Sequence, residues 1–332
     1  MIITLNTLEI NEKVNKMAEA HEAIIVKDHG SLVLVTPSKM NAVKDGFQEL
    51  VKTSVVLESD IQLASKKYVS KKRTIDFGNF SIGGDSHNCV MITGPCSVES
   101  EEQIEQAAQL CVKLGVKILR AGAYKPRTSP YTFQGMGLDG LRLLAKMRDK
   151  YGLKVITEIR DSTHVNEVIE YADIVQIGAK SMYDHGILRG TAKCGKPVLL
   201  KRGFGTTLQE FVQAAEFILS GGNSNVMLCE RGIRTFETKT RFTLDLCGVS
   251  YLKEYTNLPV ILDPSHAIGY AYGVPDLSRA CVAMGIDGLL IESHPNPKVA
   301  KSDAQQQLTF EEFTNLHQSL QPIANAVGMK MV

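Results

Sequence analysis

Residues 90–119 read VMITGPCSVESEEQIEQAAQLCVKLGVKIL, and this stretch indicates the fold class. It begins with the apolar run Val90-Met-Ile-Thr93 and ends with a second run, Lys117-Ile-Leu119, and between them residues 101–114 have the apolar spacing of an amphipathic helix. Short runs that are apolar on both faces are typical of parallel strands covered on both sides. A strand, a helix and a strand in this order predict a βαβ unit with a parallel sheet.

The same alternation continues through the rest of the chain. Six further apolar runs lie at residues 154–157, 173–177, 197–200, 226–229, 259–262 and 288–291, and amphipathic segments such as 138–150 and 208–219 lie between them. Eight strand–helix units predict a closed (β/α)8 TIM barrel over residues 90–332, since such barrels take about 250 residues. An open doubly wound sheet is the alternative. It is disfavoured because no Gly-x-Gly-x-x-Gly turn follows an early strand.

Residues 1–65 have a different pattern. We predict strands at 2–5, 23–26, 32–35 and 55–57 and helices at 9–20 and 40–51, the βαββαβ order of a small ferredoxin-like α+β domain. Residues 66–89 then supply a polar linker and a hairpin that turns at Gly78. We expect the hairpin to cap the N-terminal face of the barrel.

Composition restricts the class of partner and the compartment. A formal net charge of +1 gives no overall field that would attract nucleic acid or a membrane surface. No apolar run is long enough to span a bilayer, and the N-terminus lacks the pattern of a signal peptide. The seven cysteines contain no Cys-x-x-Cys pair, which favours a reducing compartment. We therefore predict a cytoplasmic protein with neither nucleic acid nor membrane as partner.

The ends of the predicted strands carry many cations. Reactive residues of a (β/α)8 barrel gather at the carboxyl ends of the strands, and here those ends supply Arg120, Lys125, Lys180, Lys201 and Arg231. Burying like charges together is costly unless anions compensate them. The pattern predicts a multiply anionic substrate that carries both phosphate and carboxylate. The alternative is that several of these cations pair with Glu158, Glu230 or Glu292.

The loop after the second strand, residues 120–135, concentrates oxyanion-binding groups. It contains three cations and two hydroxyls within ten residues, stiffened by two prolines: Arg120, Lys125, Arg127, Thr128, Ser129, Pro126 and Pro130. Guanidinium and ammonium groups match phosphate and carboxylate oxygens. A solvated basic loop is the alternative reading.

A second set of strand-end residues has metal-binding chemistry. Cys96, His266 and Glu292 follow strands one, seven and eight, which become neighbours when the barrel closes, and Asp303 in the next loop adds a fourth candidate. Thiolate, imidazole and carboxylate together suit a divalent Mn, Fe, Co or Zn ion. Taken singly, Cys96 reads as a buried thiol and His266 as an ordinary polar residue. His294 is a competing ligand that ranks lower.

These residues lie in motifs that resemble those of a known family. The motifs are Gly94-Pro-Cys-Ser-Val-Glu-Ser100, Lys125-Pro-Arg-Thr128, Leu200-Lys-Arg-Gly203, Cys229-Glu-Arg-Gly232, Asp263-Pro-Ser-His266 and Glu292-Ser-His-Pro-Asn-Pro297. Over about residues 60–325 the chain resembles the class I (type I beta) 3-deoxy-D-arabino-heptulosonate 7-phosphate (DAHP) synthases with a small N-terminal domain. The resemblance implies a transferase that condenses phosphoenolpyruvate with erythrose 4-phosphate and releases phosphate. That reaction opens the shikimate route to aromatic amino acids.

The resemblance also implies roles for particular residues. It assigns the metal to Cys96, His266, Glu292 and Asp303, phosphoenolpyruvate to Arg120, Lys125, Ala179, Lys180, Lys201 and Arg231, and erythrose 4-phosphate to Pro126, Arg127 and Thr128. The metal would polarise the aldehyde as a Lewis acid. Besides Cys96 and His266, we expect two catalytic residues: Lys125 as proton donor to the forming alkoxide and Glu158 as the group that orients water.

Two stretches depart from the family pattern. The family has Ala-Arg-Asn-Met-Gln-Asn where this chain has Ala179-Lys-Ser-Met-Tyr-Asp184, and Met-Ser-Ala-Thr where it has Phe204-Gly-Thr-Thr207. Lysine keeps the charge of arginine but loses its two-pronged fork. The departures leave open a paralogue with shifted kinetics or a different aldehyde.

Two alternative functions remain open. One is the sister 3-deoxy-octulosonate 8-phosphate synthase, which uses arabinose 5-phosphate; Lys125-Pro-Arg-Thr128 favours the four-carbon acceptor instead. The other is a catalytically altered barrel that binds an amino acid. The resemblance further implies feedback inhibition by an aromatic amino acid through residues 1–65, and a homo-oligomer, in relatives often a tetramer.

Overall fold

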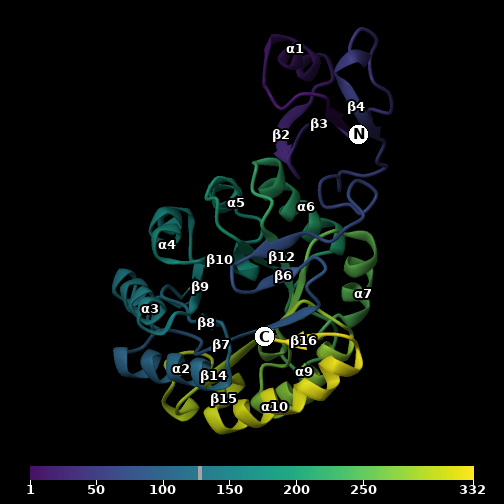
Figure 1. The fold of residues 1–332 in the computed structure, drawn as a ribbon. Helices are drawn as coiled ribbons and strands as arrows, with labels where there is room; N and C mark the ends of the chain where they lie inside the picture. Colours follow the sequence, from purple (N-terminus) through teal and green to yellow (C-terminus); the bar gives the residue numbers. More distant parts are fainter. Residues whose placement is uncertain (126–128) are drawn as a thin grey trace.

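The computed structural model describes residues 1–125 and 129–332. It contains a closed barrel of parallel strands surrounded by helices and a separate four-stranded antiparallel sheet at the N-terminus (Figure 1). The predicted fold class, a (β/α)8 barrel preceded by an α+β region, is confirmed for the barrel. No helix among the described residues combines the length and apolar character needed to cross a membrane.

All eight predicted apolar runs are barrel strands. They are β7 (Asn88–Gly94), β8 (Ile118–Arg120), β9 (Lys154–Ile159), β10 (Ile174–Ile177), β11 (Val198–Lys201), β12 (Val226–Glu230), β13 (Val260–Leu262) and β14 (Gly288–His294). Each strand pairs in parallel with the next, and β14 pairs with β7 in a register that runs from Gly288 opposite Val90 to Glu292 opposite Gly94. This last pairing closes the barrel and excludes an open sheet.

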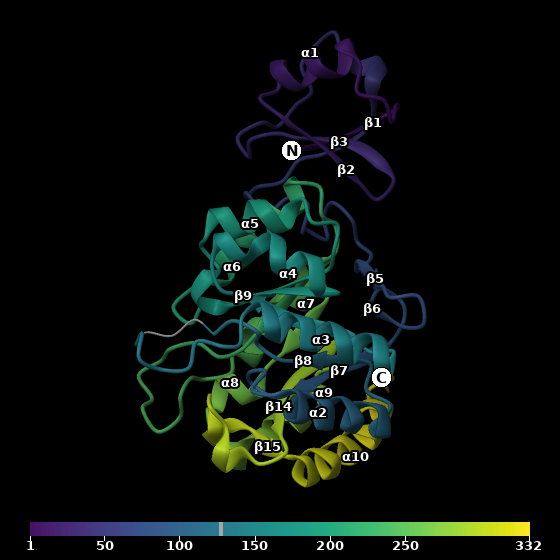
Figure 2. The same cartoon turned by 90° about the vertical axis from the view of Figure 1, so that its left-hand side faces the viewer.

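Helices follow the strands and, apart from the short α8 directly after β13, form the outer ring (Figure 2). They are α2 (Glu101–Leu114), α3 (Leu138–Tyr151), α4 (Val165–Tyr171), α5 (His185–Ala192), α6 (Leu208–Ser220), α7 (Leu246–Tyr255), α8 (Pro264–Ile268), α9 (Val274–Ala283) and α10 (Phe310–Ala326). Short strands β15 (Leu308–Thr309) and β16 (Lys330–Met331) pair with β14 and β7. Local sequence fixes the helix ends: the Ser100 side chain caps α2, which Gly115 ends in a left-handed conformation.

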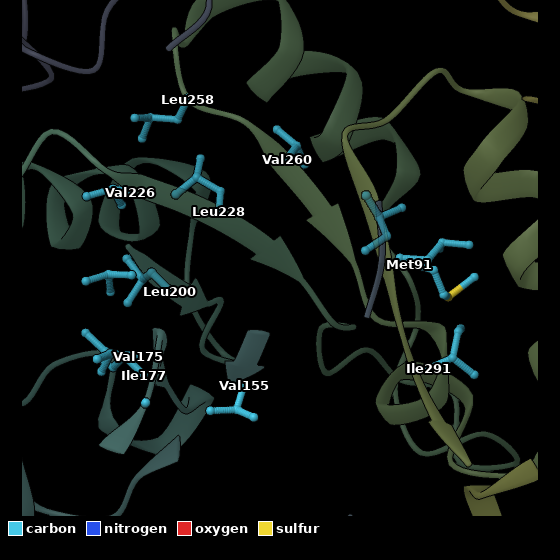
Figure 3. Close-up of a cluster of buried hydrophobic side chains, with 14 of the residues drawn as sticks. Met91, Val155, Val175, Ile177, Leu200, Val226, Leu228, Leu258, Val260 and Ile291 are labelled. Carbon is cyan, nitrogen blue, oxygen red and sulfur yellow. The ribbon is translucent and has the colours of Figure 1, made fainter. Parts of the chain in front are cut away.

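The barrel strands divide their side chains between two apolar layers. Outward-facing residues such as Val155, Leu228 and Ile291 belong to a large cluster shared with the helices (Figure 3). Inward-facing residues form a second cluster: Val90, Ile92, Ile118, Ile156, Ile174, Leu199, Met227, Cys229, Ile261 and Leu290. Side chains alternate along a strand, so the next inward position after this layer lies at the carboxyl end of the barrel.

The N-terminal region is built on a four-stranded antiparallel sheet. Its elements are β1 (Ile2–Leu5), α1 (Glu12–Ala20), β2 (Ile24–Asp28), β3 (Ser31–Val35) and β4 (Val51–Val55), and the strand order is β2-β3-β1-β4. Met17 of α1 packs with Ile3 and Leu34 in a core separate from that of the barrel.

The second helix predicted for this region was wrong. Residues 40–51 contain only the short 3-10 turn η1 (Gln48–Leu50), and the last strand begins at Val51 rather than Val55. Gly46 has φ +89°, a left-handed conformation that interrupts a helix. Local periodicity therefore overstated the helical tendency of this segment.

The segment between the two regions contacts both of them. Arg73 forms a buried ion pair with Asp28 of β2, Nη1 to Oδ1 2.7 Å, and its Nε donates to Oδ1 of Asn257 on the barrel at 3.0 Å. The hairpin of β5 (Thr74–Asp76) and β6 (Ser81–Gly83) contributes apolar side chains to the inward-facing barrel cluster. The hairpin therefore packs against the apolar interior of the barrel.

Candidate active site

Strand alternation brings charged side chains together above the inner apolar layer. Arg120, Glu158, Lys201 and Glu292 each lie two residues beyond an inward-facing apolar residue of their own strand, as Arg120 does after Ile118. The ends of the strands and the following loops enclose a cavity of about 460 Å³. Its lining residues are Lys125, Glu158, Ala179, Lys180, Lys201, Phe204, Arg231, Arg234, Arg241, Phe242, His266 and Asp303.

Three of the four predicted metal ligands are close enough to share one ion. One donor atom from each of Cys96, Glu292 and Asp303 lies within 4.8 Å of the others. His266 is adjacent rather than part of this triad, with Nε2 3.5 Å from Oε1 of Glu292. Sulfur, carboxylate and imidazole donors are an appropriate set for a borderline divalent cation.

Neighbouring amides hold two of these donors in position. Nε2 of Gln306 donates to Oε2 of Glu292 at 2.6 Å, and Oε1 of Gln307 accepts from the backbone N–H of Cys96 at 2.9 Å. Asp303 has φ +45°, in a region that few residues other than glycine occupy. Such strain is often retained at functional sites.

The protonation of these donors depends on burial and charge. Burial raises the pKa of the Cys96 thiol to about 12, and the carboxylate of Glu292 acts in the same direction. Burial lowers the pKa of His266 and so favours the neutral imidazole, the form that binds metals. Burial tends to raise the pKa of Asp303, but Lys125 and other nearby cations hold it well below its usual range. The Lys125 ammonium only partly opposes this rise in the pKa of Cys96, and a bound metal ion would favour the thiolate.

The cations of the site fall into two groups. Arg120 and Lys201 pair with carboxylates: Nη1 of Arg120 lies 2.6 Å from Oε1 of Glu292, and Nζ of Lys201 lies 2.6 Å from Oδ2 of Asp263. The alternative that cations pair with Glu158, Glu230 or Glu292 is correct for Arg120, whereas Lys201 pairs with Asp263, an acid that the alternative did not name. The Nε of Arg120 is nevertheless buried without a hydrogen-bond partner among the described residues.

Arg231 belongs to the second group. It is only 4% exposed, and its guanidinium donates to two backbone carbonyls, of His266 at 3.3 Å and of Gly232 at 3.5 Å. No carboxylate of the described residues lies within ion-pair distance of it. Burial lowers its pKa. A buried guanidinium without a counter-ion, facing a cavity, marks a position for an anion.

Lys125 and Glu158 face the same cavity. Nζ of Lys125 lies 3.0 Å from Sγ of Cys96 and 3.3 Å from its carbonyl oxygen. Gly122 permits this approach, because a Cβ there would meet Lys125 Cδ at 2.8 Å. Oε2 of Glu158 accepts from Nε2 of Gln176 at 2.6 Å. The ammonium is therefore next to the candidate metal ligands.

The remaining predicted site residues lie partly outside the cavity and partly in its lining. Nε2 of His294 is 3.6 Å from Oε2 of Glu99, outside the triad. Glu230 is buried against Arg202, with Nη1 to Oε2 at 2.9 Å, and does not line the cavity. Ala179 and Lys180 do line it. Pro126, Arg127 and Thr128, the predicted acceptor site, lie outside the described residues.

Four lining residues were not among the predicted site residues, although the first lies in a stretch that departs from the family pattern: Phe204, Arg234, Arg241 and Phe242. The last three come from the loop after β12, which folds back on itself through a bridge between Ile233 and Thr243. One sequence feature could have indicated these residues: the loop contains further basic residues after Arg231, in the stretch RGIRTFETKTRF at 231–242.

Comparison with known proteins agrees with this geometry. The sequence model described as the DAHP synthetase I family matches residues 60–327. The chain belongs to the DAHP synthetase I family. This membership makes it an enzyme of the DAHP synthase type.

Relatives of the DAHP synthetase I family extend the comparison over the whole chain. A phospho-2-dehydro-3-deoxyheptonate aldolase of Thermotoga maritima is 41% identical over 339 residues and covers 100% of both chains. A 2-dehydro-3-deoxyphosphooctonate aldolase of Acidithiobacillus ferrooxidans is 30% identical and covers 74% of this chain and 92% of its own. The crystal structure of the Thermotoga maritima DAHP synthase aligns with TM-score 0.81 and 40% identity, covering 100% of this chain and 99% of its own.

Proposed function

We propose that the protein condenses phosphoenolpyruvate with erythrose 4-phosphate and releases inorganic phosphate, as a metal-dependent DAHP synthase. One observation carries the proposal: a single cavity is lined both by Asp303, a member of the donor triad with Cys96 and Glu292, and by Arg231, a buried cation that lacks a carboxylate partner among the described residues. The full-length relative named as a phospho-2-dehydro-3-deoxyheptonate aldolase supports it.

Phosphoenolpyruvate would bind among the cations of the barrel mouth. Its phosphate and carboxylate carry several negative charges, and Lys180, Lys201 and Arg231 line the cavity. Arg120 has a buried Nε with no described partner, which can donate to one of these oxygens. Ala179, also assigned to phosphoenolpyruvate, lines the same cavity.

A divalent ion would be held by Cys96, Glu292 and Asp303, with His266 adjacent. When bound, it supplies Lewis-acid activation of the aldehyde of the acceptor. Gln306 and Gln307 support the donor set by fixing Glu292 and the Cys96 backbone. Mn, Fe, Co and Zn all suit these donors.

The reaction needs a proton donor and a group that orients water, and we assign these roles to two side chains. C3 of phosphoenolpyruvate attacks the aldehyde carbon, water adds at C2, and the C–O bond to phosphate breaks. Lys125 is the proposed donor of a proton to the forming alkoxide, because its ammonium lies at Cys96 between the donor triad and the cavity. Glu158, which lines the same cavity, is the proposed residue that orients the water.

The proposed binding site for erythrose 4-phosphate, the acceptor aldehyde, is in the loop after β8. We keep Pro126, Arg127 and Thr128 as the proposed phosphate site of erythrose 4-phosphate. The greater identity to the heptonate aldolase, 41% against 30% for the octonate aldolase, favours the four-carbon acceptor over arabinose 5-phosphate.

Phosphate release from phosphoenolpyruvate tests the function directly. Release should require erythrose 4-phosphate, be much slower with arabinose 5-phosphate, and stop when a chelator removes the metal. Faster turnover with arabinose 5-phosphate would indicate the octulosonate reaction. No activity with either aldose and any of the four metals would favour a binding protein.

We also propose that residues 1–65 sense an aromatic amino acid and that the protein is a homo-oligomer, in accord with the family resemblance. The assay is repeated with tyrosine, phenylalanine and tryptophan, and with a variant that lacks residues 1–65. Inhibition that survives the deletion would show that this region is not the sensor. Light scattering gives the number of subunits.

A further inference from the structure

Two phenylalanine rings form part of the cavity wall. Phe204, in the loop after β11, stacks on Phe242, in the loop after β12, with ring centroids 5.5 Å apart and planes inclined by 25°. Both rings line the cavity. Phe204 occupies one of the positions where the sequence departs from the usual family pattern.

An arginine guanidinium lies against each of the two rings. The guanidinium carbon of Arg231 lies 4.3 Å from the ring centroid of Phe242, and that of Arg234 lies 4.8 Å from the centroid of Phe204. Arginine stacks on aromatic faces by cation–π attraction and keeps its N–H edges available for acceptors. The stack therefore fixes two guanidinium planes while leaving their donors for other partners.

The backbone reinforces the arrangement. The N–H of Arg234 donates to the carbonyl oxygen of Phe204 at 2.6 Å, which joins the two loops directly. Ile233 pairs with Thr243 in a short bridge that brings Phe242 back toward the barrel. The stack is thus held by main-chain contacts on both sides.

The two guanidiniums lack counter-ions among the described residues. Neither Arg231 nor Arg234 has a carboxylate within ion-pair distance there, although both line the cavity. Lys180, on the same lining, presents a point charge without the planar fork of arginine. A second guanidinium supplies the fork geometry that suits a phosphate.

We propose that Arg234 is a further substrate-binding residue, which contacts the phosphate of phosphoenolpyruvate, and that Phe204 and Phe242 are positioning residues for Arg234 and Arg231. The identity of this ligand rests on the proposed function. The loops after β11 and β12 also follow Lys201 and Arg231, two residues assigned to phosphoenolpyruvate.

Equilibrium binding and steady-state kinetics test the proposal on the full chain. Titration calorimetry with phosphoenolpyruvate alone, in Mn²⁺, gives a dissociation constant that needs no turnover. Arg234→Gln should weaken this binding about tenfold, as expected for the loss of a charge-assisted hydrogen bond. The KM for phosphoenolpyruvate should rise similarly, while kcat and the KM for erythrose 4-phosphate stay within about twofold. Arg142→Gln, at an exposed position on α3, is the matched control.

Variants of Phe204 test whether this ring positions Arg234 or only stabilises the fold. Phe204→Leu should reproduce the Arg234→Gln effect because Arg234 loses its aromatic support, and Phe204→Tyr, which keeps the ring face, should bind as the wild type does. The double variant Phe204→Leu/Arg234→Gln should be no weaker than either single variant, since both remove one interaction. Melting temperatures identify any variant that fails to fold.

The outcomes distinguish this inference from the proposed function. Unchanged binding in Arg234→Gln, an effect confined to the acceptor KM, or additive losses in the double variant would each overturn it. If the wild type binds phosphoenolpyruvate but turns over no aldose, the proposed function fails while the binding data still decide the role of Arg234. A wild type that does not bind phosphoenolpyruvate overturns both.

Discussion

Arg120 and Glu292 form a buried ion pair at the centre of the site, with Nη1 2.6 Å from Oε1. The same carboxylate belongs to the donor triad with Cys96 and Asp303, and Nε2 of His266 lies 3.5 Å from it. Glu292 therefore links the cations that would bind phosphoenolpyruvate to the candidate metal ligands. A change at this carboxylate should affect both halves of the site together.

Glu292→Gln tests this link. The amide removes a negative donor from the triad and leaves Arg120 buried without its counter-ion, which is costly. We expect metal affinity to fall at least about tenfold and the KM for phosphoenolpyruvate to change as well. Competition with a chromogenic chelator measures the metal affinity, and steady-state kinetics measure the KM. Glu311→Gln, exposed on α10, is the control. Loss of metal affinity with an unchanged KM would show that the two halves act independently.

Lys125→Ala should abolish turnover while fold and metal content remain. Removal of a general acid typically costs about 100- to 10,000-fold in rate. The loss should appear in kcat, measured by phosphate release at saturating substrates, with circular dichroism and elemental analysis as checks on fold and metal. Lys113→Ala, an exposed lysine of α2, should be unaffected. Near-normal turnover of Lys125→Ala would rule out its role as proton donor.

Lys180→Arg restores the residue that the family usually has after the fourth strand of the barrel. A guanidinium fork can hold two oxygens where an ammonium acts as a point charge. We expect the KM for phosphoenolpyruvate to fall by about three- to tenfold, corresponding to roughly one added hydrogen bond. An unchanged or higher KM would contradict this expectation and would mean that other cations already hold the phosphate.

The sequence predicted the parts of the site that follow from strand periodicity. Lys201 and Glu292 were predicted because an apolar strand positions the residue at its carboxyl end, whatever loop follows. Phe242 and Arg234 were missed because their positions depend on a bridge between Ile233 and Thr243, which no local pattern reveals. The wrong helix at 40–51 has a related cause, since residues 40–47 form bends and turns, with a left-handed Gly46, that local periodicity does not reveal.

The carboxyl of Glu216 on α6 predicts a pH-dependent stability. It accepts backbone N–H bonds from Gln62 and Ala64 at 2.7 and 2.8 Å on one oxygen and from Leu63 at 3.1 Å on the other. These contacts hold residues 62–64 against α6 of the barrel. Burial nevertheless raises the pKa of Glu216 from 4.5 to about 7, and the three N–H bonds oppose this only in part.

The sign of the effect follows from linkage. Between about pH 4.5 and 7 the folded protein retains a proton on Glu216 that the unfolded chain has lost, so the free energy of unfolding falls as the pH rises. Glu216→Gln cannot titrate. Relative to this variant, the wild type should lose about 2–3 kcal/mol of stability from pH 4.5 to pH 8. Urea unfolding of both proteins at several pH values measures the difference, with Glu19→Gln, exposed on α1, as control. A difference that is constant with pH, or that favours the wild type increasingly at high pH, would mean that the three N–H bonds outweigh burial at this carboxylate.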